Sequence, residues 1–199
     1  MNNSSNKVAA VWGDYASPLL YVYLLGMMAV IAGILTTAMT LQYVEGELPC
    51  PLCLLQRAAM LGVCFGIIQQ FRHGYSYFNV GVCLAFSVFL LIVSVRQTLL
   101  DIYPRPGHAY VGSAVFGLHM PVWSVIIAAC LLTALALQLL IWGGNKAVAD
   151  KSIGMYPALK TIAMMLSLYV IAIAVINFVS VGVQCEFNQC HTFSYQLLD

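Results

Sequence analysis

The chain has few charged residues. Asp, Glu, Lys and Arg make up only 8% of its 199 residues, whereas a soluble globular domain has about 25%. Hydrophobic residues make up 62%, and the formal net charge is only +1. Such a balance does not provide the basic surface that nucleic acid attracts. The composition predicts an integral membrane protein that lies in a lipid bilayer and binds no nucleic acid.

Internal repeats and low-complexity segments are also absent, and the length leaves no room for a separate soluble domain. A helix needs about 20 apolar residues to cross the hydrocarbon. Five stretches nearly free of charge meet this requirement: Pro18–Val44, Leu54–Phe71, Phe78–Leu100, Val122–Trp142 and Thr161–Val183. The first is too long for the core of a signal peptide and no obvious cleavage site follows it, so we interpret it as a retained span.

The charged residues predict an orientation, because cytoplasmic loops hold Lys and Arg in excess. With five crossings, five basic residues outside the spans fall on one side and five acidic residues fall on the other. The basic set is Lys7, Arg72, Lys146, Lys151 and Lys160, and the acidic set is Glu45, Glu47, Asp101, Glu186 and Asp199. We therefore expect residues 1–17 and the loop 143–160 in the cytoplasm, and the tail 184–199 outside.

Cysteine is absent from the expected cytoplasmic loops. Of seven cysteines, Cys50 and Cys53 follow the first span, and Cys185 and Cys190 follow the last. Both pairs fall on the outer side, and disulfides persist in oxidising compartments. The other three, which lie within spans, are interpreted as small hydrophobic residues: Cys64, Cys83 and Cys130.

Three interpretations of the Cys50-x-x-Cys53 pair remain open: a redox-active disulfide, a static disulfide, or half of a zinc or copper site completed by Cys185 and Cys190. So small a ring gains little from loop closure, and nothing in this short chain requires a metal for folding. Cys53 begins the second span, and Pro51 suits a helix start. A helix N-terminus stabilises a thiolate. These features favour redox chemistry without metal.

Polar residues near the outer ends of two spans are candidates for binding an electron acceptor. Arg57 lies four residues after Cys53, on the same helical face, and a charged residue within a span is costly and usually functional. It could stabilise the Cys53 thiolate and contact a carbonyl oxygen of the acceptor, or it could snorkel to the headgroups. Arg96 and Gln97 lie at a similar depth in the third span and could line the same cavity, although an arginine near a helix end also snorkels.

Cys185 and Cys190 are separated by four residues directly after the last span. One hypothesis is a permanent staple of the tail. The other is a shuttle pair that meets soluble partners and reduces Cys50–Cys53 by thiolate attack through a mixed disulfide. Such exchange requires an accessible pair, which a tail provides.

Several motifs together resemble the bacterial inner-membrane disulfide-bond formation protein B (DsbB) family. The run Pro49-Cys50-Pro51-Leu52-Cys53 followed by Arg57 resembles its redox motif, and Leu100–Pro104 resembles the end of its third helix. Residues Gly117–Trp123 resemble the Gly-Leu-x-Met-Pro-x-Trp stretch before its fourth helix. The resemblance runs from about Leu48 to Trp142.

The resemblance implies a four-helix bundle over residues 18–142, to which this chain adds a fifth span over 161–183. It implies a protein-disulfide:quinone oxidoreductase in the bacterial inner membrane. Such an enzyme reoxidises a periplasmic thioredoxin-fold dithiol oxidase (DsbA-like) and reduces ubiquinone or menaquinone from the membrane pool, supporting disulfide formation in periplasmic proteins. By this analogy Cys50 and Cys53 are coupled to the quinone, Cys53 is the nearer of the two, and Arg57 contacts it.

The chain departs from the family pattern in its second redox pair. The family has that pair in the loop between helices 3 and 4, whereas the corresponding loop from Asp101 to Pro121 contains no cysteine. We infer that Cys185 and Cys190 in the periplasmic tail replace it. Gln97 falls near a position where some members have histidine. Two alternatives belong to other classes: a membrane protein that handles a soft metal such as copper, and a non-catalytic assembly subunit stapled by disulfides.

Overall fold

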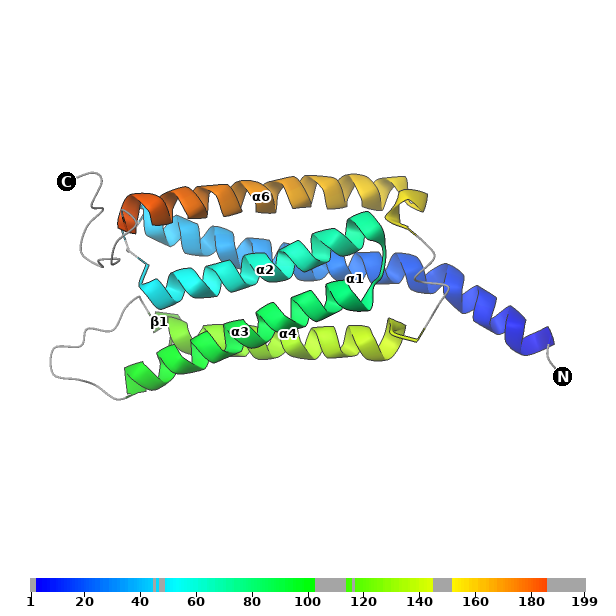
Figure 1. The fold of residues 1–199 in the computed structure, drawn as a ribbon, viewed down its shortest axis with the longest axis horizontal. Coiled ribbons are helices and arrows are strands. Elements are labelled where there is room, and N and C mark those ends of the chain that lie inside the picture. Colours follow the sequence, from blue (N-terminus) through cyan, green and yellow to red (C-terminus); the bar gives the residue numbers. More distant parts are fainter. Residues whose placement is uncertain are drawn as a thin grey trace.

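The structure, a computed structural model, describes residues 3–44, 46, 49–102, 114–115, 117–144 and 152–185. Long helices dominate the described chain (Figure 1). They are α1 (Asn3–Val44), α2 (Pro51–His73), α3 (Tyr77–Ile102), α4 (Met120–Trp142) and α6 (Pro157–Cys185). A short antiparallel hairpin of β1 (Ala114–Val115) and β2 (Leu118–His119) precedes α4, and one 3-10 turn, η1 (Ile153–Met155), precedes α6.

Within the described residues, five helices are long and apolar enough to cross a membrane. The crossing segments run over Tyr15–Val44, Pro51–His73, Tyr77–Ile102, Met120–Trp142 and Pro157–Val183. Each contains one of the five stretches expected from the sequence. The expected all-α membrane fold with a fifth C-terminal span is confirmed.

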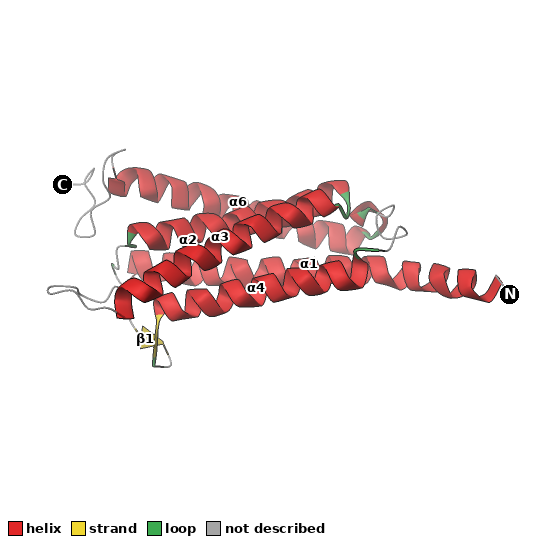
Figure 2. Cartoon of the chain, turned by 60° about the horizontal axis from the view of Figure 1, so that its bottom comes forward, coloured by secondary structure: helices red, strands yellow, loops and turns green. Residues whose placement is uncertain are grey.

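Helices α1 to α4 form a closed bundle in which α2 packs on α1, α3 on α2, and α4 on both α3 and α1. Helix α6 lies outside this ring against α1 and α2 (Figures 1 and 2). Hydrogen bonds fasten α4 to α1, from the Tyr23 hydroxyl to the Ala134 carbonyl (2.8 Å) and from the Trp142 indole to the Ala16 carbonyl (2.9 Å).

Close approach of α2 and α3 depends on two glycines of α2. A Cβ atom added at Gly62 would overlap the ring of Phe86, and one added at Gly66 would overlap the sulfur of Cys83. Small residues let helix backbones approach in a membrane, where packing contacts contribute much of the attraction between helices. These glycines therefore fix how closely α2 and α3 pack.

Polar side chains join α6 to the bundle. Thr36 and Tyr169 share a hydrogen bond of 2.7 Å, and Tyr43 is hydrogen-bonded to Ser180 nearer the end of both helices. Between these contacts, Asn177 of α6 is buried and accepts a hydrogen bond from Arg57 of α2. The fifth span is thus part of the packed structure around Arg57.

Candidate redox site

A disulfide joins Cys50 to Cys53 at the N-terminal end of α2, with 5.1 Å between their Cα atoms. Cys50 is buried and Cys53 is half-buried. This end of α2 lies at the same end of the bundle as the last turns of α3 and α6 (Figure 1). The disulfide therefore lies where a helix begins and at one end of the bundle.

The start of α2 explains the position of each sulfur. Cys50 is the N-cap residue in an extended conformation, and Pro51 follows in the first turn, where its missing N–H is not needed. The Cys50 sulfur accepts a hydrogen bond from the backbone N–H of Cys53 (3.1 Å). The sequence placed Cys53 at the helix start, but the structure places the Cys50 sulfur over the first turn, with Cys53 third in the helix.

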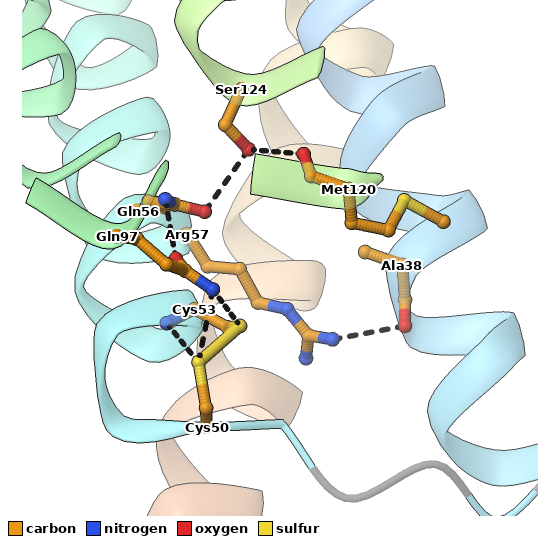
Figure 3. Close-up of a disulfide and its surroundings, with 8 residues drawn as sticks. All are labelled: Ala38, Cys50, Cys53, Gln56, Arg57, Gln97, Met120 and Ser124. Atoms are coloured by element: carbon orange, nitrogen blue, oxygen red, sulfur yellow. Dashed lines mark hydrogen bonds between the residues drawn. A yellow bond between two sulfur atoms is a disulfide. The ribbon is translucent and has the colours of Figure 1, made fainter. Parts of the chain in front are cut away.

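An amide side chain contacts both sulfurs. The Gln97 amide nitrogen, from α3, lies 3.4 Å from the Cys50 sulfur and 3.4 Å from the Cys53 sulfur. Gln56 of α2 donates to the Gln97 carbonyl oxygen (2.8 Å), and the hydroxyl of Ser124, on α4, donates to the Gln56 oxygen (3.0 Å). Figure 3 shows these side chains in line from Ser124 to the disulfide.

Arg57 is only 8% exposed. Its guanidinium donates to two oxygens of α1, the side chain of Gln42 (2.5 Å) and the carbonyl of Ala38 (3.0 Å). It also reaches the sulfur of Met39 (3.4 Å) and, on α6, the side-chain oxygen of Asn177 (3.5 Å). These partners draw the side chain towards α1 (Figure 3), and Arg57 lies one helical turn further along α2 than Cys53. Arg57 is therefore held inside the bundle by hydrogen bonds and does not extend to the lipid headgroups.

The other site residues expected from the sequence have different surroundings. Arg96 is exposed while its neighbour Gln97 is buried, so the two side chains lie on different faces of α3. Cys185 is the last residue of α6, at the end of the bundle that holds the disulfide (Figure 1). The Cys185 side chain and Cys190 lie outside the described residues.

Sequence analysis missed four polar residues of the site: Gln42, Gln56, Ser124 and Asn177. Three of them are amide side chains inside apolar spans, and such residues usually face the interior of a bundle. This signal was present in the sequence. Their partners could not be derived from it, because each hydrogen bond joins two different helices and depends on how those helices are rotated against each other.

The cysteines within the spans divide into two groups. Cys64 and Cys83 are buried in the core between α2 and α3, and Cys130 of α4 is exposed. The Cys83 thiol donates to the carbonyl of Val63 (3.5 Å). These cysteines therefore do not form one continuous line of sulfur across the bilayer.

The fold and the site together define a class: a multi-pass helical membrane protein with a disulfide at one end of its bundle. Residues 21–109 match the family described as Disulfide bond formation protein DsbB. The resemblance inferred from the sequence is thereby confirmed, and the chain is similar to the DsbB family from residue 21, within α1, to the end of α3.

A curated relative supports the same relationship. The chain is 32% identical over 84 residues to the Disulfide bond formation protein B of Aromatoleum aromaticum (strain DSM 19018 / LMG 30748 / EbN1). That alignment covers 40% of this chain and 51% of the relative, so the chain spans about half the length of the protein it matches. No solved structure matches the chain. The family match ends before α4 and α6, so Ser124 and Asn177 lie outside it.

Proposed function

We propose that this protein is a membrane thiol oxidase of the bacterial inner membrane. It accepts two electrons from a reduced periplasmic thioredoxin-fold protein and passes them through the Cys50–Cys53 disulfide to a membrane quinone. The observation that carries the proposal is a disulfide at the end of a transmembrane bundle, in contact with a buried amide and one helical turn from a buried arginine. The match to a family named for disulfide bond formation supports it.

The proposed electron path begins at the tail. A thiolate of the reduced partner attacks a Cys185–Cys190 disulfide, forms a mixed disulfide, and leaves as an oxidised protein when its second thiol attacks. The tail dithiol then reduces Cys50–Cys53 in the same manner. Cys185 ends α6 at the end of the bundle that holds Cys50–Cys53, which favours this transfer. Each exchange breaks one disulfide, forms another, and moves two electrons and two protons.

The residues around Cys53 suit a quinone as the final acceptor, whether ubiquinone or menaquinone. A quinone ring requires apolar surroundings and hydrogen-bond donors for its two carbonyl oxygens. The spans supply the apolar surroundings. The donors are the Arg57 guanidinium, one helical turn after Cys53 on α2, and the Gln97 amide of α3, which lies 3.4 Å from the Cys53 sulfur. When bound, the quinone takes up two electrons and two protons and leaves as quinol. Arg57 and Gln97 hold the acceptor beside Cys53, and Arg96 lines its approach from the lipid.

Anaerobic quinone absorbance tests this proposal. The purified protein is mixed with a quinone and a reduced thioredoxin-fold dithiol protein, and the loss of the quinone band is followed. We expect turnover by the wild type and by Cys130→Ser, which removes an exposed cysteine far from the site. We expect none from Cys50→Ser/Cys53→Ser. No turnover by the wild type across several quinones and partners would refute the oxidase.

The tail is tested in the same assay with Cys185→Ser/Cys190→Ser. Loss of turnover with the protein partner, but retained turnover with a small dithiol such as dithiothreitol, is expected of a shuttle pair. Equal turnover with both reductants would make the tail pair a staple. The orientation follows from the same proposal: N-terminus in the cytoplasm and tail in the periplasm.

A further inference from the structure

A series of three hydrogen-bonded polar side chains, from three helices, ends at the disulfide. We propose that Ser124, Gln56 and Gln97 form a hydrogen-bonded relay that directs one amide donor at both sulfurs and so determines how readily the Cys50–Cys53 disulfide is reduced. The inference deepens the proposed thiol oxidase function. It assigns Gln97 the role of hydrogen-bond donor to the two sulfurs, and it makes Gln56 and Ser124 the residues that position Gln97.

The order of donors and acceptors in the relay determines which end of Gln97 meets the sulfurs. The Gln56 oxygen accepts from the Ser124 hydroxyl (3.0 Å), which leaves the Gln56 nitrogen as donor to the Gln97 oxygen (2.8 Å). The Gln97 nitrogen then faces the sulfurs, as Figure 3 shows. The Ser124 hydroxyl also lies 3.3 Å from the Met120 carbonyl of its own helix, but the Gln56 oxygen is the nearer acceptor, and this bond orients the two amides that follow in the relay.

Burial strengthens this arrangement. Gln56 and Gln97 are each only 6% exposed, so water does not compete freely for their amide groups. An unsatisfied buried amide is costly, so each member holds the next in one orientation. The members come from α2, α3 and α4, and the relay is complete only when these three helices pack together.

The relay acts differently on the two redox states. Hydrogen bonds to an ionised group are roughly twice as strong as those between neutral groups. A donor beside the sulfurs therefore stabilises a thiolate more than it stabilises the disulfide. Since the Gln97 nitrogen is 3.4 Å from each sulfur, it supports whichever sulfur leaves as thiolate. The expected consequence is a more oxidising disulfide, because its reduction releases a stabilised thiolate.

The test equilibrates the full-length protein, purified free of quinone, with glutathione buffers of graded ratio under anaerobic conditions. In this exchange two glutathione thiols become one glutathione disulfide as Cys50–Cys53 becomes a dithiol. After alkylation, mass spectrometry of the peptide containing Cys50 and Cys53 gives the reduced fraction. We expect Gln97→Leu to lower the equilibrium constant for reduction about tenfold, which corresponds to ~30 mV.

Ser124→Ala should lower the same constant about threefold, because it removes the hydroxyl that orients Gln56 and leaves both amides in place. The matched control is Thr133→Val, also on α4. Its hydroxyl bonds only to the Ala129 carbonyl of its own helix among the described contacts, and it should leave the constant unchanged. In the reduced protein, the pH profile of alkylation should move to higher pH in Gln97→Leu, a readout that a purely structural role would not alter.

An unchanged equilibrium constant in folded Gln97→Leu would overturn the relay. If Gln97→Leu does not fold, the test rests on Ser124→Ala, and an unchanged equilibrium constant for reduction in that variant would also overturn the relay. Because this measurement contains no quinone, it separates the two proposals. If the variants change the equilibrium constant for reduction but the wild type does not reduce quinone, the relay is supported and the oxidase is rejected. If the wild type reduces quinone but the variants leave the constant unchanged, the oxidase is supported and the relay is rejected.

Discussion

At the scale of single residues, Arg57 is a charged side chain buried inside the bundle, which is energetically costly. A charge inside a membrane segment must be paired with polar groups, and here those groups are neutral oxygens from Gln42, Ala38 and Asn177. These oxygens stabilise the positive charge of the guanidinium inside the bundle. Such a cation can attract a developing negative charge nearby, as on a thiolate or a reduced carbonyl.

Replacement of Arg57 by alanine tests this role. Under the proposed function, Arg57→Ala should raise the KM for quinone about tenfold, because a hydrogen bond from a charged donor contributes about 1.5–3 kcal/mol. The KM for the dithiol partner should not change. Arg72→Ala, at the exposed far end of α2, serves as control for loss of a positive charge. Unaltered quinone kinetics in Arg57→Ala would contradict the assignment.

The sequence identified Cys50, Cys53 and Arg57 because spacing along one chain segment carries their signal. It also identified Gln97 by its depth, but not its contact with the sulfurs. Gln56, Ser124 and Asn177 were missed because their importance arises from partners 41 to 120 residues away. Contacts of this kind depend on how helices rotate against one another, and hydropathy does not encode that rotation.

At the scale of helices, the α2–α3 contact is the tightest feature of the bundle. Gly66→Ala would bring a methyl group against the Cys83 sulfur and within 3.1 Å of the Asn79 carbonyl oxygen. Overpacking of this kind costs about 1–3 kcal/mol. We expect a loss of that size in the free energy of unfolding, measured by titration with a denaturing detergent.

Two variants serve as controls for that change. Gly81→Ala, on α3, adds the same methyl group where no heavy atom lies within 4 Å, and it should leave stability nearly unchanged. Cys83→Ala combined with Gly66→Ala removes the overlapping sulfur and should recover part of the loss. Equal stability of Gly66→Ala and Gly81→Ala would show that the helices are not held at this distance.

The helices themselves were predictable because long apolar runs determine them. Hydropathy alone did not predict the helical turns that lie outside those runs. Helix α2 begins at Pro51, as the proline indicated, three residues before the apolar stretch that starts at Leu54, and the Cys50 sulfur caps it. Helix α1 begins at Asn3, well before the apolar run at Pro18. Hydropathy detects where a helix enters lipid, not where its hydrogen bonds begin.

At the scale of the whole molecule, the described residues contain five helices able to cross a membrane, and five crossings would leave the start of α1 and the end of α6 on opposite sides. Within the described chain, α1 starts at one end of the bundle and α6 finishes at the other (Figure 1). The proposed electron path requires that the finishing end be periplasmic. The excess of Lys and Arg in the opposite loops predicts the same orientation.

Fusion of alkaline phosphatase, which is active only outside the cytoplasm, tests the orientation. A fusion after Asp199 should be active, and a fusion after Gly144, at the end of α4, should be inactive at similar expression. The reversed pattern would place the tail in the cytoplasm and remove it from the electron path. A reporter that becomes fluorescent only in the cytoplasm should give complementary results.

The hydrogen-bond partners of Arg57 are also synthesised in a definite order. Ala38 and Gln42 precede Arg57 in the chain, whereas Asn177 follows it by 120 residues. At about 5–20 residues per second, the ribosome makes Asn177 roughly 6–24 seconds after Arg57. The guanidinium therefore enters the bilayer with its first two acceptors already synthesised, and the last span adds the third after the hairpin of α1 and α2 exists.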